Sequence, residues 1–248
     1  MEDIRAIILA AGKGTRMKSE LPKVLHEIDG KPLAQYVIDA AKEAGAKELC
    51  LVVGYQRDRV MERLAGNTGV TFAVQKEQLG TGHAVMCASQ FLGQKGQVFI
   101  LCGDTPLITG ETLQAFAQYH KAQGNAVTVL SAVLDNADGY GRILRDEAGT
   151  FVKSVEHKDA TPKEREVKEV NAGMYIFDAG YLKEALTHLT TDNAQGEYYL
   201  PDTMDFIRAA GGKVDAWKVA DATEIAGVNT PEQLAEAAAV IVDRRRQA

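Results

Sequence analysis

Apolar runs and amphipathic stripes alternate along the first half of the chain, and this alternation constrains the fold more than any other feature. Residues 4–10 are apolar except for Arg5, which is typical of a strand buried in a parallel sheet. From Pro32 onward, apolar residues recur at the spacing of one helical face, and Gly45 stands just beyond them. The alternation continues with strands at 48–53, 71–75, 97–102 and 126–134 and helices at 56–65, 81–92 and 110–123. This order predicts βαβ units, and hence an α/β fold with a mostly parallel sheet flanked by helices.

The pattern changes after Tyr140. Short strands at 142–145 and 150–156 predict a hairpin, and a charged segment leads to a further strand at 170–177. We therefore expect a smaller α+β lobe at about residues 136–226, after a first lobe at about residues 1–135. Beyond it, Thr, Pro and Gln at positions 230, 231 and 233 are typical of a helix start, which predicts a C-terminal helix over 230–248.

Composition excludes several classes of protein. The 248 residues carry 28 Lys and Arg against 34 Asp and Glu, a net charge of −6, so no basic excess exists to bind a nucleic-acid backbone. The N-terminal apolar run is far shorter than the roughly 18 residues that span a bilayer, so we expect a cytoplasmic protein without a membrane partner. Cys50, Cys87 and Cys102 form neither a metal pair nor an even disulfide set, and we expect three buried thiols.

A glycine loop follows the first strand, with the sequence LAAGKGTRM at residues 9–17. Gly12 and Gly14 let backbone N–H groups face a phosphate without obstruction from a Cβ. The loop does not match the dinucleotide-binding pattern, because Met17 occupies the place of its third glycine, and no Gly-Lys pair has the P-loop spacing. A tight turn against a helix is the alternative. A phosphate loop is favoured because three cations lie in or near it, namely Lys13, Arg16 and Lys23.

Further blocks in a fixed order carry a resemblance to a known family. They are LPK at 21–23, QKEQLGTGHA at 75–84, GDTPL at 103–107, GYGRI at 139–143, VEHKDA at 155–160, NAGMY at 171–175, GEYYL at 196–200 and GVN at 227–229. With the glycine loop, they resemble the sugar-1-phosphate nucleotidyltransferases, and in particular the uridylyltransferase domain of the bacterial bifunctional enzyme that makes UDP-N-acetylglucosamine. The resemblance spans essentially the whole chain.

The resemblance implies a domain organisation and an activity. Residues 1–229 would form a Rossmann-like uridylyltransferase domain, with a nucleotide-binding lobe at 1–135, a sugar-binding lobe at 136–226 and a linker helix at 230–248. The activity implied is the Mg²⁺-dependent transfer of UMP from UTP to N-acetylglucosamine-1-phosphate. The products would be UDP-N-acetylglucosamine, a precursor of peptidoglycan and lipopolysaccharide, and pyrophosphate.

The family's full-length enzyme continues into a second domain. That domain is a left-handed β-helix of hexapeptide repeats, which acetylates glucosamine-1-phosphate with acetyl-CoA and through which the enzyme forms a homotrimer. No hexapeptide period occurs in this sequence. We therefore expect that domain to be absent from this chain, and no residue here to bind acetyl-CoA.

The resemblance implies a magnesium site at Asp104 and Asn229. Asp104 follows the predicted strand at 97–102, and carboxylate and amide oxygens are donors that suit Mg²⁺. The resemblance also implies that Arg16 and Lys23 contact the phosphates and act in catalysis together with Asp104.

The resemblance further places substrate contacts along the chain. For the nucleotide, the residues implied are Leu9, Ala10, Ala11, Gly12, Gly14, Lys23, Gln75, Gly80 and Thr81. For the N-acetylglucosamine moiety, they are Gly141, Glu156, Asn171 and Tyr199. The amide of Gln75 would read the uracil edge, because it offers both a donor and an acceptor. His83 is expected to be a structural residue, since the displacement needs no general base.

Several of these residues also have a simpler structural alternative. Asp104 can form a turn ahead of a proline, and Asn229 and Thr81 can cap helices. Lys23 can be a solvated loop cation, and Glu156 can form a surface ion pair.

Three other functions stay open at this stage. A glycosyltransferase of similar architecture commonly holds its metal with an Asp-x-Asp pair, and no Asp in this sequence is followed by another two positions later. An inactive nucleotide-sugar-binding subunit would lack the metal pair or the loop cations, which are present here. Another sugar-1-phosphate nucleotidyltransferase would differ only in its choice of base and sugar.

Overall fold

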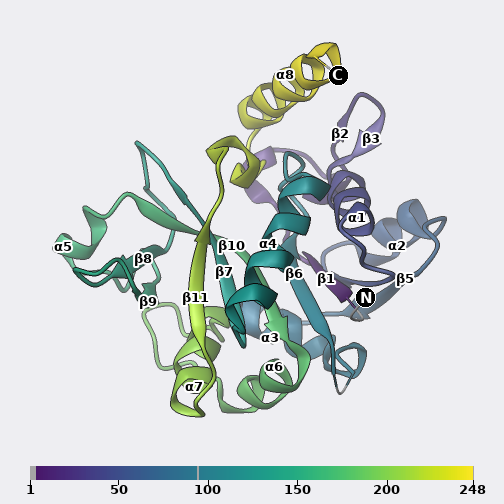
Figure 1. Ribbon diagram of the computed structural model, residues 1–248. Helices are drawn as coiled ribbons and strands as arrows, with labels where there is room; N and C mark the ends of the chain where they lie inside the picture. The colour runs from purple at the N-terminus through teal and green to yellow at the C-terminus, as the bar shows by residue number, and fades with distance from the viewer. Residues whose placement is uncertain (1–3, 94, 248) are drawn as a thin grey trace.

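A nine-stranded mixed sheet runs through the centre of the protein in the computed structural model, which describes residues 4–93 and 95–247 (Figure 1). Seven strands follow the order β11-β7-β10-β6-β1-β4-β5. Their bounds are β1 Ile4–Ala10, β4 Glu48–Val53, β5 Val70–Val74, β6 Gln97–Cys102, β7 Val127–Val133, β10 Glu169–Asp178 and β11 Val214–Lys218. The predicted α/β class is confirmed.

Most neighbouring strands are parallel. β1 pairs in parallel with β4 and β6, β4 with β5, and β11 with β7. The exception is β10, which lies between β6 and β7 and runs antiparallel to both. The carboxyl ends of β1 and β6 therefore meet at the same edge of the sheet, where open α/β sheets bind their ligands.

Helices cover both faces of the sheet. One apolar cluster joins the sheet to α1 (Leu33–Glu43), α2 (Arg57–Leu64) and α4 (Gly110–Gln123). A second joins the opposite face to three shorter helices, α3 Thr81–Cys87, α6 Ala179–Ala185 and α7 Thr203–Ala209. Within β1, Ile8 belongs to the first cluster and Ile7 to the second, and both are fully buried. This two-sided burial is the reason that the strand reads as a nearly unbroken apolar run.

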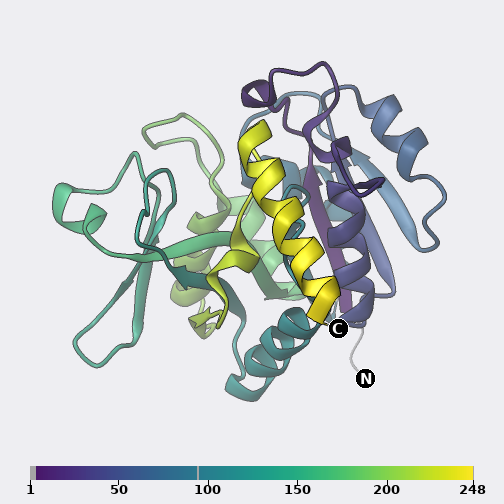
Figure 2. The same ribbon diagram turned by 90° about the horizontal axis from the view of Figure 1, so that it is seen from above.

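The C-terminal helix α8 (Pro231–Gln247) packs beside the first helix (Figure 2). Ala237 and Ile241 share a small apolar cluster with Leu33 at the start of α1 and with Val228. Arg244 of α8 also donates a hydrogen bond of 2.7 Å to a loop carbonyl oxygen, that of Leu107. These contacts fix α8 against the start of α1 and the loop after β6.

A hairpin projects from the sheet on the side away from α2 (Figure 2). It consists of β8 (Arg142–Arg145) and β9 (Phe151–Val155), and α5 (Pro162–Arg165) follows it. Segment 136–226 also contributes β10 and β11 to the central sheet. The division into lobes at residue 135 stays a prediction, and the two parts of the chain share one sheet.

The structure differs from the sequence-based expectations in three places. The helix expected at 81–92 is interrupted, because α3 ends at Cys87 and a short 3-10 helix, Ser89–Phe91, follows. Only Cys50 is fully buried, whereas Cys87 and Cys102 keep part of their surface exposed. The sequence analysis missed α6, α7 and β11. No helix in the described part of the chain is long and apolar enough to cross a membrane.

Candidate active site

Four side chains from distant parts of the sequence meet beyond the carboxyl ends of β1 and β6. Lys23 forms an ion pair with Asp104 and donates a hydrogen bond of 2.9 Å to Asn229 Oδ1. Arg16 donates to the same oxygen, also at 2.9 Å. The structure therefore brings together all four residues for which the sequence predicted roles at the metal and the phosphates.

The glycine loop places Lys23. Gly14 adopts a left-handed conformation with φ of 64°, and a Cβ there would lie 2.6 Å from Lys23 Cβ. Any larger residue would push the two segments apart. Lys23 itself opens a short 3-10 helix, Lys23–Leu25, whose Val24 and Leu25 are buried.

Backbone hydrogen bonds place the other two segments. Gly103 N donates to Leu9 O at 2.9 Å, which holds the loop after β6 against the end of β1. Val228 N donates to Asp104 O at 2.8 Å, so the residue before Asn229 is tied to Asp104. The two predicted metal ligands are thus joined through their backbones as well as through Lys23.

Asp104 and Asn229 offer two hard oxygens that converge on one cation. Both oxygens contact the ammonium of Lys23. The side chains of Lys23 and Asp104 are largely buried, at 16% and 20% exposed. Carboxylate and amide oxygens fit Mg²⁺, which keeps waters and phosphate oxygens as further ligands. Across residues 4–93 and 95–247, no group of three or more His, Cys, Asp or Glu could form a metal cage from protein side chains alone. The donor set therefore suits a metal shared with a phosphate substrate.

The end of β5 forms a second part of the site. Gln75 is 4% exposed, and its Nε2 donates to Gly80 O and to His83 Nδ1, both at 3.1 Å. Gly80 has φ of 105°, and a Cβ there would lie 2.6 Å from Tyr198 O. Thr81 Oγ1 accepts a hydrogen bond of 3.2 Å from the backbone N–H of the residue after Tyr199. The three residues predicted to contact the base thus lie together.

Two adjoining cavities extend from this edge of the sheet. One, of about 280 Å³, is lined by Arg16, Asp104 and Asn229, and the other, of about 190 Å³, by Thr81, Gly141, Glu156 and Asn171. They share four lining residues: Cys102, Gly139, Tyr140 and Ala172. The cavity at Arg16, Asp104 and Asn229 therefore borders the cavity at Gly141, Glu156 and Asn171, whereas Lys23 and Tyr199 line neither.

The predicted sugar-side residues differ in how many of their polar atoms the protein already uses. Asn171 donates to Tyr175 Oη at 2.8 Å and to Ser154 Oγ at 3.0 Å, and its Oδ1 accepts from a backbone N–H. Tyr199 is buried, and its hydroxyl donates to Asp159 at 3.2 Å. A Cβ at Gly141 would lie 3.5 Å from Glu156 Oε1, so the glycine keeps this corner open.

The carboxyl of Glu156 is electrostatically unfavourable in its ionised form. Burial raises its pKa above the usual range, and the nearby carboxylates of Asp202, Asp159 and Glu197 raise it further. The folded protein therefore binds this proton more tightly than the unfolded chain does. Stability linked to this group falls as the pH rises above the unfolded pKa of about 4.3.

We expect Glu156→Gln to raise the Tm, and to raise it more at pH 8 than at pH 4. The amide mimics the protonated acid, so it removes the repulsion that ionisation creates at high pH. Thermal melts of the variant and the unchanged protein at both pH values measure the effect. A Tm difference that is equal at the two values, or larger at pH 4, would contradict this assignment.

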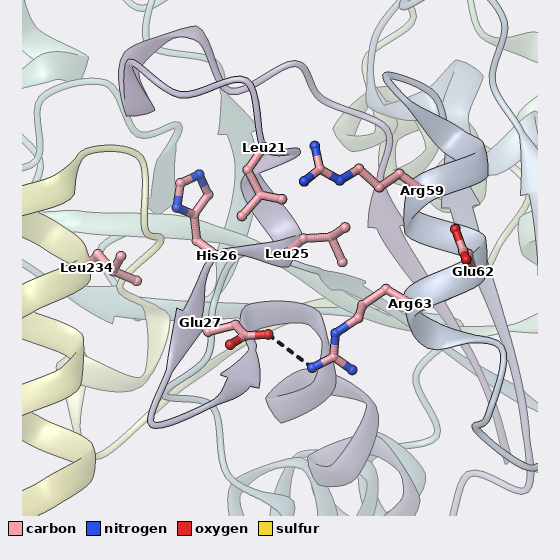
Figure 3. A pocket seen from close by; sticks show the side chains of 8 residues that line it. All are labelled: Leu21, Leu25, His26, Glu27, Arg59, Glu62, Arg63 and Leu234. Atoms are coloured by element: carbon pink, nitrogen blue, oxygen red, sulfur yellow. Dashed lines mark hydrogen bonds and ion pairs between the residues drawn. The ribbon is translucent and has the colours of Figure 1, made fainter.

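A cavity of about 650 Å³ lies outside this edge, between α2, α8 and the segment after Lys23 (Figure 3). Leu21, Leu25 and Leu234 form its apolar part. Glu27 and Arg63 pair across it at 3.0 Å, as Figure 3 shows. Because acids and bases are balanced there, its lining lacks the excess of cations that phosphate groups need.

Sequence reasoning missed two residues that support the site. Gln78 Nε2 donates to Ala11 O at 2.8 Å and so braces the glycine loop. His83, predicted to be merely structural, contacts Gln75 directly. Neither contact has a periodic signal, because each depends on how a loop folds back onto the end of a strand.

Proteins similar to this chain have been described. The bifunctional protein GlmU of Caldanaerobacter subterraneus subsp. tengcongensis is 53% identical over 246 residues, which are 99% of this chain and 53% of that protein. The bifunctional protein GlmU of Pelobacter propionicus is 51% identical over 247 residues, with the same two coverages. The chain thus spans about half the length of these relatives.

The fold and the family are also shown by comparison. A crystal structure assigned to a glucose-1-phosphate thymidylyltransferase of Bacillus anthracis superposes with a TM-score of 0.77 over 96% of this chain and 94% of that one. At 18% identity, that likeness shows the fold alone. The family model of the MobA-like NTP transferase domain matches residues 6–149, more than half of the chain. The chain therefore belongs to the family of MobA-like NTP transferase domains.

Proposed function

We propose that this chain transfers UMP from UTP to N-acetylglucosamine-1-phosphate in a Mg²⁺-dependent reaction, giving UDP-N-acetylglucosamine and pyrophosphate. The observation that carries the proposal is the convergence of Arg16, Lys23, Asp104 and Asn229 on one point beyond the glycine loop. The match to the NTP transferase family and the relatives at about 50% identity, which are named bifunctional protein GlmU, support the choice of this nucleotidyltransferase.

The reaction is a displacement at phosphorus. An oxygen of the sugar 1-phosphate forms a bond to the α-phosphorus of UTP, and the bond from that phosphorus to the bridging oxygen breaks, so that pyrophosphate leaves. The attacking oxygen is already deprotonated, and no general base is needed. The protein's task is to hold several anions together and to stabilise the charge that moves onto the leaving group.

The site residues divide this task. Lys23 and Arg16 supply fixed positive charge toward the phosphates, while the glycine loop offers backbone N–H groups. Asp104 and Asn229 would hold the Mg²⁺ ion, which when bound neutralises phosphate charge. Lys23 contacts one oxygen of Asp104 and one of Asn229 in the structure. If these two oxygens hold the metal ion, the Lys23 ammonium would turn from them toward the phosphates.

The sugar side would be bound by Glu156, Gly141 and Asn171, which line the cavity that adjoins the phosphate side. Tyr199 lies behind it, with its hydroxyl bonded to Asp159. We assign the reaction to the cytoplasm, where nucleoside triphosphates are found. Trimer formation is proposed only for the longer protein that the relatives represent.

Pyrophosphate release, measured over a panel of nucleoside triphosphates and sugar 1-phosphates, tests the proposal. We expect UTP to be preferred over CTP by about 10- to 100-fold in kcat/KM, because the wrong base leaves the amide oxygen of Gln75 unpaired, at about 1–3 kcal/mol. A competing preference for dTTP is a weaker discriminator, since thymine shares the pairing edge of uracil. Equal kcat/KM for UTP and CTP would contradict the assignment.

A further inference from the structure

We propose that His83 is a positioning residue for base selection, which fixes the amide of Gln75 so that only its oxygen is presented to the nucleotide. This arrangement selects a base that carries a ring N–H, such as uracil, over one whose corresponding ring nitrogen is an acceptor, such as cytosine. The inference rests on the proposed function and deepens it.

The carbonyl oxygen of Gly80 fixes the orientation of the Gln75 amide. Its Nε2 lies 3.1 Å from Gly80 O, and a carbonyl oxygen can only accept a hydrogen bond. The atom facing Gly80 is therefore the nitrogen, because the reversed amide would set two acceptors against each other. Gly80 cannot move away, since Tyr198 N donates to the preceding carbonyl oxygen, that of Leu79, and Gly82 N donates to Tyr198 O, both at 2.8 Å.

The contact with Gln75 also fixes the tautomer of His83. The other hydrogen of Gln75 Nε2 points to His83 Nδ1 at 3.1 Å. Nδ1 must then carry a lone pair, and the neutral ring bears its proton on Nε2, which lies 3.9 Å from Cys87 Sγ. The imidazole thus accepts from Gln75 and cannot donate to it.

Only the oxygen of the Gln75 amide is left to bind the nucleotide. Both hydrogens of Gln75 Nε2 are used, and the described hydrogen bonds leave its Oε1 without a protein partner. Gln75 as a whole is 4% exposed, so its neighbours hold the rest of the side chain in place. An acceptor held in this way pairs with the N3–H of uracil, whereas N3 of cytosine is itself an acceptor and is repelled.

His83 is needed because one hydrogen bond does not fix an amide plane. With Gly80 O as its only partner, the Gln75 amide can turn about its last side-chain bond, which is a broad torsion. A buried N–H without an acceptor also favours conformations in which it finds one elsewhere. Loss of the acceptor at position 83 therefore affects recognition of the base rather than the chemical step.

The test compares variants of the full chain that differ in where they place an acceptor. His83→Asn can set Oδ1 near the position of Nδ1, His83→Gln sets its oxygen near the position of Nε2, and His83→Leu has no acceptor. We measure kcat and KM for UTP and for CTP at saturating N-acetylglucosamine-1-phosphate. The ratio of the two kcat/KM values should fall about 10-fold in the Leu and Gln variants, through KM for UTP, and be restored in the Asn variant.

A matched control uses another histidine. His188 stacks on Phe206 at a centroid distance of 3.9 Å and has no described contact with Gln75. His188→Leu should leave the UTP to CTP ratio unchanged, even where it lowers the Tm.

The possible outcomes distinguish an error in the proposed function from an error in the role of His83. If the unchanged protein releases no pyrophosphate from UTP, the proposed function is wrong. If it does, and either the Leu or the Gln variant folds and keeps the original ratio, the role of His83 is wrong. Failure of a folded Asn variant to restore the ratio would also overturn it. Because Leu and Gln differ in polarity, a folding defect in one leaves the other as the test.

Discussion

Replacing Lys23 with alanine should lower kcat/KM for uridylyl transfer by about 30- to 1,000-fold. The ammonium lies beside Asp104 and Asn229 in a largely buried position, so its charge stays within the site when it turns from these oxygens to the phosphates. Removing one such electrostatic contact costs on the order of 2–4 kcal/mol of transition-state stabilisation. Steady-state kinetics at saturating Mg²⁺ measures the loss.

Lys31 provides a matched control for this experiment. It is also a lysine in an ion pair, with Asp39, but it lies on the β2–β3 hairpin (Glu27–Ile28 and Lys31–Pro32) rather than in the site. Lys31→Ala should leave kcat/KM within about twofold, as expected for an exposed ion pair. If Lys23→Ala changed only the Tm and not kcat/KM, Lys23 would be a bystander in the reaction.

Asp104→Ala should lower turnover by about 1,000-fold or more. The substitution removes the only carboxylate among the proposed metal ligands, and metal-ion charge stabilisation is worth several kcal/mol. It also leaves the largely buried Lys23 without its ion pair, so the ammonium keeps only Asn229 as a described acceptor among these residues. Measurements of kcat across a Mg²⁺ titration, with circular dichroism to verify the fold, test this expectation.

The second proposed metal ligand, Asn229, should have a smaller effect on activity than Asp104. Asn229→Ala should raise the Mg²⁺ concentration needed for half-maximal rate and cost less than Asp104→Ala, because an amide brings no charge to the ion. Near-original activity of Asp104→Ala at limiting Mg²⁺ would refute the assignment. So would a loss of activity in both variants that is independent of the Mg²⁺ concentration.

Local patterns predicted most elements of the first half of the chain and its mostly parallel sheet, but neither the elements between residues 178 and 230 nor the place of β10. The apolar run at the start of the chain and the helical stripe after Pro32 became β1 and α1 within a residue or two. The position of β10 between β6 and β7 could not be predicted, because strand pairing depends on contacts between residues far apart in the sequence. The helix expected to continue past Cys87 ends there, and Ala88 has left helical geometry, with φ of −99° and ψ of 11°.

The resemblance named the residues of the proposed site but not the contacts between them. The resemblance named Asp104, Asn229, Arg16 and Lys23, and the structure places them together. It gave no indication that Lys23 contacts both proposed metal ligands. The contact between Gln75 and His83 was likewise missed, since it depends on the path of the loop between them. Such details are set by tertiary packing, which a single sequence does not display.

The place of β10 in the sheet has a consequence for synthesis on the ribosome. β6 and β7 follow one another in the chain, yet the strand between them, Glu169–Asp178, begins 36 residues after β7 ends. Until it emerges, β6 has an unpaired edge and β7 has no neighbour, because β11 is made later still. Apolar strands with open edges are prone to pair with other chains. The nascent polypeptide thus passes through a vulnerable stage that ends only when β10 closes the gap.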